Sequence, residues 1–397
     1  MTDAALQRAS AGIIVGAGPA GRALASELLR EGVAAVCVDP RAEAPWRTTW
    51  GLWDDEVTRH GLAGAVAARS EGPRVRFAHD HEVTLTRGYS VLDPERLRAR
   101  LSAGLTLVRA RATEVGIDEV RLDDGRVWRA PFVIDTRAPR ATTCAQTAVG
   151  QVVRARGLPS YLMDFSLDFD DQDPRPTFGY LVPLDDERVL VEETALAASP
   201  PMEDALLRRR LAQRLRALGL EASVDARAPL EHVRIPLDVD ARAIPGAATR
   251  FGVGGGAVHP ATGYALARIL DDAPGVARAI RRALDERRAP AQIALAAWRA
   301  QWSGSRRATR RLLEHGREVL LALDLEGLRS FFGAFFLLDP ARQRAFLTST
   351  SSPLEVAGAM ASMWGELPWS LRARALLGGR APRPLGARGR SARADLV

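Results

Sequence analysis

A glycine-rich segment near the start of the chain restricts its fold more than any other feature. Gly16, Gly18 and Gly21 lie between a short apolar run, residues 13–15, and a helical pattern over residues 22–30. In this spacing the glycines permit a tight turn, a close approach of the backbone to a pyrophosphate, and close packing of the helix on the strand. The segment therefore predicts a Rossmann-like dinucleotide-binding unit with a parallel β-sheet.

Residues that flank these glycines favour the same unit. Asp39 follows a second apolar stretch, 33–38, and lies 18 residues after Gly21. A carboxylate at that spacing can accept hydrogen bonds from the adenosine ribose hydroxyls, and its charge disfavours the 2′-phosphate of NADP. Pro19 suits the first turn of the helix, because a backbone N–H there would have no partner within the helix. We expect further dinucleotide contacts from Pro19, Ala20, Asp39 and Pro40.

A second glycine cluster follows the apolar residues 251–253 and precedes a helical pattern over 264–270. The repeated order of strand, glycines and helix predicts that the chain returns to the nucleotide-binding sheet. FAD and NAD both fit the first motif, but a second set of backbone amides could hold the flavin half of an extended dinucleotide, which favours FAD. The arrangement resembles that of flavoproteins related to the aromatic hydroxylases, which usually have Gly-Asp where this chain has Gly256-Ala257. The expected contacts on this side are Gly254, Gly255, Gly256, His259, Thr262, Gly263 and Tyr264. His259 would either hydrogen-bond the flavin or cap the following helix.

The remaining sequence predicts an α/β protein, α+β overall, built onto this domain. The pattern is strand-like from Val75 to Trp128, and residues 178–182 and 188–192 form a hairpin pattern around a turn. Residues after about 291 are mostly helical in pattern. We expect a discontinuous FAD-binding domain (10–145 and 241–285), an inserted substrate-binding lobe of antiparallel strands (146–240), a C-terminal helical region (286–378) and a disordered tail (379–397).

The composition excludes several classes of partner and site. The net charge is +7, but every basic residue is Arg and no basic stripe is interleaved with aromatic residues, so no nucleic-acid partner is expected. Cys37 and Cys144 lack metal-ligand spacing, so we expect no metal site and two buried thiols in a reducing compartment. The start of the chain has no secretory-signal pattern and the apolar runs are too short to span a bilayer, so we expect a cytoplasmic protein.

Several segments, in order along the chain, resemble the plant and cyanobacterial type of lycopene cyclase. They are WGLWDDE (50–56), GYSVLDPERL (88–97), YLMDF (161–165), the long hairpin TFGYLVPLDDERVLVEETALAASPPM (177–202) and VHPATGY (258–264). The ordered set spans residues 12–275, and one departure is Leu190, where the family has Phe. The resemblance implies an FAD-dependent enzyme that closes rings at the linear ends of lycopene by acid–base chemistry, without net oxidation.

Two adjacent glutamates are the main catalytic candidates. Ring closure begins with a proton delivered to a terminal double bond, and a carboxyl group in an apolar site can hold that proton near neutral pH. Glu192 and Glu193 end an apolar strand, where alternation predicts that they point to opposite faces. The resemblance implies that Glu192 is the proton donor and that Glu193 supports the site or faces solvent; the alternative is an exposed strand end. Asp164 is a candidate second acid or a residue that orders the flavin end, with a buried helix or strand cap as the alternative.

Five aromatic residues are candidates for the substrate site: Trp53, Tyr161, Phe165, Phe178 and Tyr180. Their ring faces could stabilise a carbocation, and the alternative is that they form ordinary core. The resemblance implies that the flavin acts in its reduced form, whose charge would stabilise a developing cation without hydride transfer. Electrons would come from NAD(P)H, directly or through another protein, and the expected protein partners are an electron donor or other enzymes of the carotenoid pathway. We expect β rings, the more widespread product.

The substrate that the resemblance implies dissolves in lipid, so contact with a membrane is expected. Residues 331–338, and a segment with Trp364 and Trp369 before Arg372 and Arg374, combine apolar and basic residues as interfacial anchors do. The alternative for each is packing inside the molecule. We expect peripheral association with the cytoplasmic membrane. Two functional alternatives are a redox flavoprotein of the same fold, such as a monooxygenase or a prenyl or carotenoid reductase, and a non-catalytic carotenoid-binding flavoprotein.

Overall fold

The computed structural model describes most of the chain. The described residues are 11–139, 141–169, 171, 173–240, 248–348, 350–367, 369 and 371–372. The expected disordered tail, 379–397, and Arg374 of the expected membrane anchor lie outside them.

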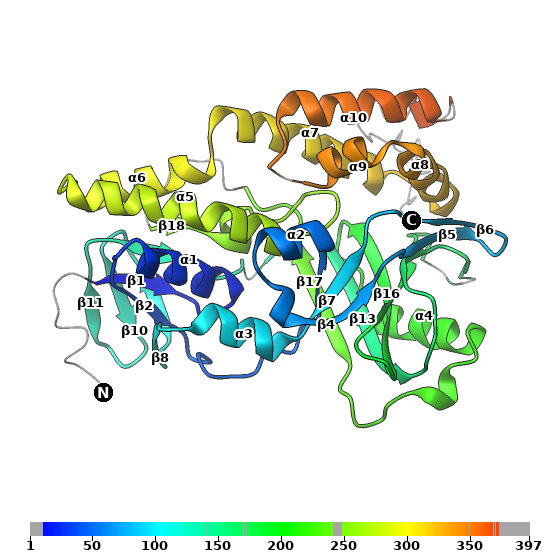
Figure 1. Ribbon diagram of the computed structural model, residues 1–397, viewed down its shortest axis with the longest axis horizontal. Coiled ribbons are helices and arrows are strands. Elements are labelled where there is room, and N and C mark those ends of the chain that lie inside the picture. The colour runs from blue at the N-terminus through cyan, green and yellow to red at the C-terminus, as the bar shows by residue number, and fades with distance from the viewer. Residues whose placement is uncertain are drawn as a thin grey trace, which may run out of the picture.

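A five-stranded parallel sheet carries the first glycine segment (Figure 1). Its order is β18-β12-β1-β2-β8, and Ile134 of β12 pairs with Thr249 of β18, so the chain returns to this sheet as expected. Ile14 faces the helices α1 and α5, whereas Ile13 and Val15 face a separate three-stranded sheet, β9–β11. The elements are β1 (Gly12–Val15), α1 (Pro19–Arg30), β2 (Ala35–Val38), β8 (Thr106–Val108), β9 (Ala112–Val115), β10 (Glu119–Leu122), β11 (Val127–Arg129), β12 (Val133–Asp135), β18 (Thr249–Arg250) and α5 (Leu266–Asp285).

A seven-stranded sheet forms the other half of the molecule, in the order β17-β13-β16-β15-β14-β5-β6. In β16, Val189 and Val191 pack against α4, whereas Leu190 packs against the C-terminal helices. We call these two sides the α4 face and the Glu192 face. The elements are β5 (Arg74–Ala78), β6 (His81–Thr84), β13 (Ala145–Arg154), β14 (Tyr161–Asp164), β15 (Phe178–Pro183), β16 (Arg188–Ala198), α4 (Asp204–Ala217), η2 (Glu221–Ser223) and β17 (Glu231–Pro236).

A small antiparallel sheet and a short helix lie between the two halves (Figure 1). In this sheet β7 is the central strand, with β3 and β4 on either side. Tyr89 of β7 pairs with Trp53 of β3, which brings two aromatic side chains to the end of the sheet where α2 begins. The elements are β3 (Trp50–Trp53), α2 (Asp54–Arg59), η1 (Ala63–Ala65), β4 (Val66–Ser70), β7 (Tyr89–Leu92) and α3 (Pro94–Ser102).

The C-terminal helices lie along one side of both halves, at the top of the view in Figure 1. Phe331, Phe332 and Phe335 of α8 are buried against the Glu192 face, so this part of the apolar cluster expected as a membrane anchor packs inside the molecule, the alternative that was left open. Among the described residues, no helix combines the length and apolar character needed to cross a bilayer. The elements are α6 (Pro290–Gln301), α7 (Gly304–Leu321), α8 (Leu325–Leu337), α9 (Pro340–Leu347) and α10 (Pro353–Glu366).

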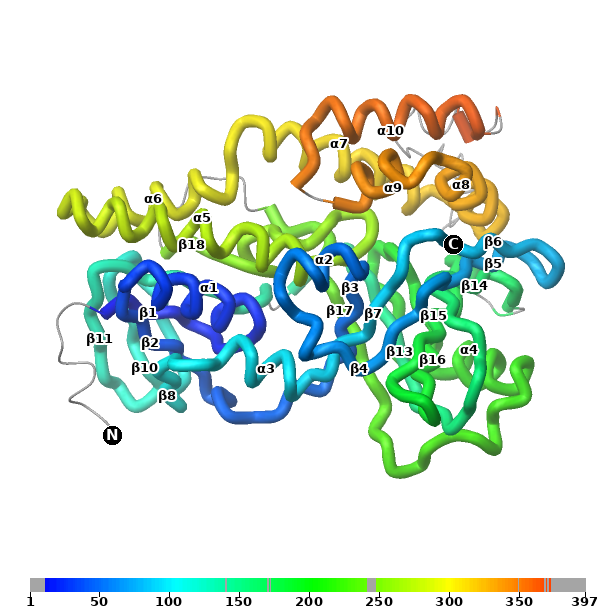
Figure 2. The backbone as a smooth tube through the Cα atoms, viewed as in Figure 1, coloured from blue at the N-terminus to red at the C-terminus, as the bar shows by residue number. Residues whose placement is uncertain are grey.

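Two features differ from the sequence expectation. The stretch expected to be strand-like contains α3, whose start is marked by the Asp93 side chain accepting a hydrogen bond from the Arg96 N–H and by Pro94 in the first turn. In addition, β5 pairs with β14 and β6 pairs with β5, so both strands belong to the seven-stranded sheet, although residues 10–145 were expected to form the nucleotide-binding domain (Figure 2). Short alternating segments do not reveal which sheet they will join, because their pairing is decided by distant residues.

Candidate functional site

The first glycine segment has the geometry of a dinucleotide turn. Gly16 adopts a φ of +106°, which favours glycine, and a Cβ on Gly21 would collide with the Gly16 carbonyl. A Cβ on Gly18, by contrast, would have no protein atom within 4 Å. Gly18 therefore keeps an open position at the N-terminus of α1, where backbone N–H groups and the helix dipole attract an anion.

Asp39 lies at the carboxyl end of β2, next to this turn. Its carboxylate accepts hydrogen bonds from the backbone N–H of Ala17 (3.0 Å) and of Arg41 (2.7 Å). A carboxylate has about four acceptor positions, so capacity for ribose hydroxyls remains. The side chain is partly exposed, as a ligand contact requires.

The second glycine cluster packs directly on the first. A Cβ on Gly252, whose φ is +75°, would collide with the Cβ of Ala20 in α1, and a Cβ on Gly254 would collide with the Arg137 carbonyl. The short helix η3 (Gly252–Gly255) is thus held between α1 and the end of β12. The sequence prediction that both glycine segments belong to one region is confirmed.

Side chains from the C-terminal helices hold the loop that follows η3. The Trp302 indole N–H donates to the Gly255 carbonyl (3.1 Å), and Arg310 donates to the carbonyls of Gly256 (3.0 Å) and Val258 (2.6 Å). Arg310 is buried, so these bonds form away from water. Sequence analysis did not connect these helical residues with the loop, because nothing in their spacing marks the contact.

His259 has a different environment from either one expected. Its Nε2 lies 2.8 Å from the Phe346 carbonyl, and its Nδ1 accepts from the Ala261 N–H at 3.2 Å. The ring is fully buried, and burial lowers its pKa to about 4, so the imidazole is neutral. With both nitrogens bonded to the protein, His259 ties the loop to α9 and has no free nitrogen for a flavin.

Glu192 lies in a row of residues that crosses three neighbouring strands. It pairs with Gly150 of β13 on one side and with Tyr180 of β15 on the other, and Gly150 in turn pairs with Glu231 of β17. Residues that pair directly share a face, so Glu231, Gly150, Glu192 and Tyr180 all lie on the Glu192 face. The prediction that Glu192 and Glu193 point to opposite faces is confirmed by this register.

The two carboxyl groups of this row, Glu192 and Glu231, differ in their hydrogen bonds and in what shifts their pKa. Glu192 is 8% exposed, and burial, with a contribution from the nearby Glu231, raises its pKa well above the ordinary value. Glu231 accepts two hydrogen bonds from Thr49, from the N–H at 2.6 Å and from the hydroxyl at 2.7 Å. Burial raises the pKa of Glu231 as well, but these hydrogen bonds oppose the shift. Glu192 is therefore the better holder of a proton.

Buried polar atoms without partners accumulate beside this row. Within the described part of the chain, the indole N–H of Trp53, Oε1 of Gln146 and the hydroxyl of Thr194 are buried without a hydrogen bond. Gln146 Oε1 also fills the space that a Cβ on Gly263 would need, which places the loop after η3 against β13. Unsatisfied buried groups usually indicate a missing ligand or water. The edge of an isoalloxazine ring carries both donors and acceptors, so these residues fit a flavin.

Three phenol groups extend the row toward the glycine loop. The Tyr180 hydroxyl donates to that of Tyr89 at 3.2 Å, and Tyr264 makes a further side-chain hydrogen bond with Tyr89. Burial raises the pKa of all three phenols well above the ordinary value, so they remain neutral. Tyr264 was expected to contact the cofactor, and the structure places it beside the Glu192 face.

Glu193 and Asp164 lie on the opposite side of the sheet from Glu192. Arg214 of α4 donates to Glu193 at 2.6 Å and to Asp164 at 3.2 Å, and all three side chains are fully buried. Asp164 also accepts from the Ser166 N–H at 3.0 Å. The sequence grouped these carboxylates with Glu192 as candidate catalytic residues; the structure does not bring them together with it, and their arrangement is that of a buried ion cluster on the α4 face.

The expected aromatic residues also divide between the two faces. Trp53, Phe165, Phe178 and Tyr180 belong to the cluster that packs with α8, and the rings of Phe165 and Phe178 have centroids 5.4 Å apart. Tyr161 instead lies on the α4 face, where its hydroxyl donates to Glu82 at 3.0 Å and Arg76 lies over its ring. A bulge in β14 separates it from the others, so only four of the five expected residues share a face.

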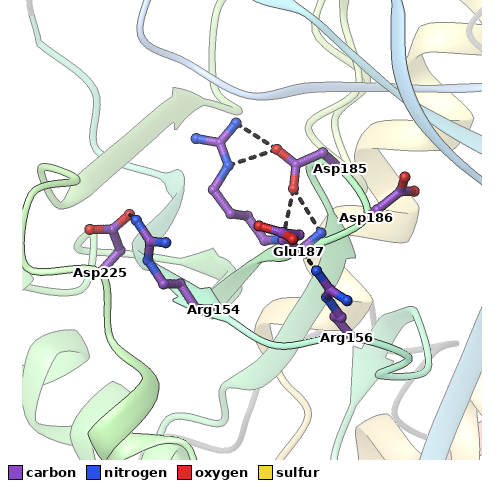
Figure 3. Close-up of a pocket in the computed structure, with 7 residues that line it drawn as sticks. Arg154, Arg156, Asp185, Asp186, Glu187 and Asp225 are labelled. Carbon is purple, nitrogen blue, oxygen red and sulfur yellow. Dashed lines mark hydrogen bonds and ion pairs between the residues drawn. The ribbon is translucent and has the colours of Figure 1, made fainter.

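A surface pocket of about 730 Å³ lies away from this region, at the turn between β15 and β16 (Figure 3). Its lining is charged, and most of its charges are paired, as in Arg154–Asp225 and Arg188–Asp185. Such a pocket has no apolar wall for a polyene and no connection with the glycine segments. The lining residues are Arg154, Arg156, Asp185, Asp186, Glu187, Arg188 and Asp225.

Several residues of the candidate site were not found from the sequence. Gly150 interrupts an apolar strand, which is a signal of close approach by a neighbouring group, and Glu192 does fill that space. Glu231 lies on the side of its strand opposite the exposed His232 and Arg234, but the sequence does not show which sheet that strand joins. Thr49 carries no local signal, because its role depends on a residue 182 positions away.

Comparison with known proteins shows the family of the chain. The family model described as lycopene cyclase protein matches residues 12–372. A chloroplastic neoxanthin synthase from Solanum lycopersicum is 31% identical over 378 residues, covering 87% of this chain and 75% of that protein. A chloroplastic lycopene beta cyclase from Arabidopsis thaliana is 30% identical over 373 residues, covering 85% and 74%.

Solved structures resemble the fold at low sequence identity. A geranylgeranyl bacteriochlorophyll reductase-like protein from Thermoplasma acidophilum gives a TM-score of 0.69 at 14% identity, covering 93% of this chain and 99% of that one. A probable FAD-dependent monooxygenase from Pseudomonas aeruginosa gives 0.55 at 20% identity, covering 81% and 98%. The expected Rossmann-like flavoprotein fold is confirmed. With a family model that matches nearly its whole length, the chain belongs to the lycopene cyclase family.

Proposed function

We propose that the protein is a lycopene cyclase that converts the linear ends of lycopene into β rings with bound reduced FAD and without net redox change. Family membership supports the substrate class and the reaction type. The observation that carries the proposal is Glu192, a buried carboxyl on the face of the sheet that the apolar C-terminal helices cover, with a pKa raised by burial. Such a group can deliver a proton to a hydrocarbon near neutral pH.

The proposed reaction is neutral in protons. Glu192 gives a proton to the terminal double bond, and the tertiary cation that results attacks an inner double bond to close the ring. A base then removes one proton beside the cationic carbon, so one proton enters and one leaves. Trp53, Phe165 and Phe178 belong to the apolar cluster on the same face, and aromatic rings beside the substrate would stabilise the cation.

Both glycine segments support FAD as the cofactor. Gly16, Gly18 and Gly21 would hold the pyrophosphate at the start of α1, and Asp39 would hold the adenosine ribose. The loop after η3 would hold the flavin end, together with Gln146 of β13, whose Oε1 has no hydrogen bond. When bound and reduced, the flavin supplies negative charge beside the cation. NAD(P)H, directly or through another protein of the pathway, would keep it reduced.

We also propose peripheral association with the cytoplasmic membrane, since the substrate is lipid-soluble. Leu337, Leu354 and Trp369 are 72%, 84% and 80% exposed, and they come from the C-terminal helical region. Arg372 lies over the Trp369 ring, with its guanidinium carbon 4.7 Å from the ring centroid. Exposed apolar side chains beside a cation are typical of interfacial contacts.

A redox flavoprotein of the same fold is the alternative, because one structural neighbour is described as reductase-like and another as a probable monooxygenase. The two functions differ in their use of electrons. A cyclase needs reductant only to reduce its flavin, whereas a reductase or monooxygenase consumes one NAD(P)H in each turnover. Measuring NAD(P)H consumed per carotenoid converted therefore separates them.

The proposal is tested by expression in lycopene-accumulating cells, followed by pigment analysis. Wild type is expected to form cyclic carotenoid, and Glu192→Gln is expected to lose about 10²–10⁴-fold in rate, the usual contribution of a general acid. Glu187→Gln is the matched control, because Glu187 is an exposed residue of the same hairpin. Cyclic product from Glu192→Gln at the wild-type rate would remove Glu192 from the mechanism.

A further inference from the structure

Glu192 and Glu231 lie on either side of Gly150, on the same face of the sheet. They occupy β16 and β17, with Gly150 of β13 between them in the same row. A Cβ on Gly150 would lie 2.7 Å from Cγ and 3.1 Å from Oε1 of Glu192, so the Glu192 side chain leans over Gly150, toward β17. Two strand spacings, about 10 Å between Cα atoms, are within the combined reach of two glutamate side chains.

The two carboxyl groups are not equivalent. Thr49 donates two hydrogen bonds to Glu231, one to each oxygen, and hydrogen bonds of this kind favour the ionised form. Among the described residues, none donates such a bond to Glu192. Two carboxylates so near each other cannot both ionise easily, and the pair therefore retains one proton to a higher pH than either group alone.

We propose that Glu231 is a positioning residue for the reaction: its carboxylate, fixed by Thr49, faces Glu192 across Gly150 and keeps the proton of the pair on Glu192. The inference rests on the proposed function, because it gives Glu231 a role in the same proton transfer. The family resemblance pointed only to the adjacent pair Glu192 and Glu193, whereas the geometry replaces Glu193 with a residue of β17, two strands away in the sheet.

The other ionisable groups near Glu192 do not compete for this role. Tyr180 of β15, Tyr89 of β7 and Tyr264 of the glycine loop are buried phenols that remain neutral. Glu56 of α2 helps to raise the pKa of Tyr89 and of Tyr264, and Arg87 lowers that of Tyr264. Glu193, Asp164 and Arg214 lie on the α4 face.

The first test is the pH profile of the purified flavin-loaded enzyme with lycopene in lipid vesicles. The rate should fall at alkaline pH as Glu192 loses its proton. In Glu231→Gln, removal of the neighbouring negative charge should move this fall to lower pH by about one unit. Glu231→Asp keeps the charge and should return the profile most of the way to wild type, whereas the exposed control Glu221→Gln should leave it unchanged. An identical alkaline limb in wild type and Glu231→Gln would overturn the proposal.

The second test detects the proton on Glu192 directly and does not depend on turnover. Infrared spectroscopy of protein labelled with ¹³C-glutamate follows the C=O stretch of protonated glutamate, and the band lost in Glu192→Gln is assigned to Glu192. In Glu231→Gln, this band should disappear at a pH about one unit lower than in wild type. An unmoved midpoint would overturn the proposal.

A second variant covers the case in which Glu231→Gln does not fold. Thr49→Val removes one donor and leaves both carboxyl groups in place, so the proton should shift toward Glu231 and the Glu192 band should shrink. A band of undiminished intensity in Thr49→Val would overturn the proposal. Because wild-type cyclisation is measured separately, absence of cyclic product would reject the proposed function, whereas cyclic product with an unmoved band would reject only the carboxyl pair.

Discussion

Arg214→Met should destabilise the protein strongly, because Arg214 is the central cation of the ion cluster on the α4 face. Its guanidinium donates to Glu193 at 2.6 Å and to Asp164 at 3.2 Å, and all three side chains are 0% exposed. The group lies over Gly179, where a Cβ would come within 2.7 Å of it. Loss of the cation would leave two carboxylates in a site that water does not reach.

The magnitude follows from which charges remain uncompensated. Removing one partner of a buried ion pair costs about 3–5 kcal/mol, since the other charge stays buried. Arg76 remains 3.8 Å from Asp164 in the variant, so the buried charge that loses its partner is mainly that of Glu193. We expect Arg214→Met to lower the free energy of unfolding by about 3–4 kcal/mol. Adding Glu193→Gln to this variant should recover about half of the loss, because it removes the stranded charge.

The assay is urea unfolding followed by circular dichroism, in which midpoints and slopes give the differences in free energy. Arg216→Met is the matched control on the same helix, because the Arg216–Glu221 pair is exposed and should be worth at most about 1 kcal/mol. Equal unfolding midpoints for Arg214→Met and Arg216→Met would refute the buried ion cluster. So would a double variant less stable than Arg214→Met alone.

Three further predictions use other parts of the molecule. Gly18→Val should abolish flavin absorbance in the purified protein and leave its circular dichroism unchanged, because a Cβ at this position enters open space and touches no protein atom. Retained flavin would contradict the assigned position of the pyrophosphate. Burial lowers the pKa of His259 to about 4, so as the pH falls the unfolded protein binds a proton on this residue before the folded protein does. The free energy of unfolding should therefore decrease between pH 6.5 and about 4, by up to about 3 kcal/mol. In thermal melts over that interval, the melting temperature of His259→Gln should depend less on pH than that of wild type. Leu354→Glu with Trp369→Glu should weaken sedimentation with anionic lipid vesicles by at least about tenfold, since two exposed apolar side chains are replaced by charges; unchanged sedimentation would exclude these residues from a membrane contact.

The nucleotide-binding half was predictable from the sequence because its signals are local. Gly16, Gly18 and Gly21 follow an apolar strand directly, and their conformations are decided within a few residues. The strand alternation that separates Glu192 from Glu193 is local as well, and the register bears it out. Even here, α3 was missed, although Asp93 and Pro94 form a recognisable helix start.

The composition of the site depended on contacts between distant segments. Asp164 looked like a partner for Glu192, but β14 turns it toward Arg214, which only the placement of α4 reveals. Glu231 became part of the site because β17 joins the sheet beside β13. His259 binds a carbonyl of α9, 87 residues later in the chain, and no motif marks such a contact. Periodicity shows which face of a strand a residue lies on, but not which element will cover that face.

The central claim is that a solvent-exchangeable proton on Glu192 is transferred to the carotenoid. Its most direct test is the mass of the ring product formed by the flavin-loaded enzyme in D₂O, with consumption of NAD(P)H measured in the same reaction. We predict one deuterium for each ring closed by the wild-type protein, a rate about 10²–10⁴-fold lower for Glu192→Gln, and far less than one NAD(P)H consumed per ring. Cyclic product that carries no deuterium, or one NAD(P)H oxidised for each ring, would contradict the account.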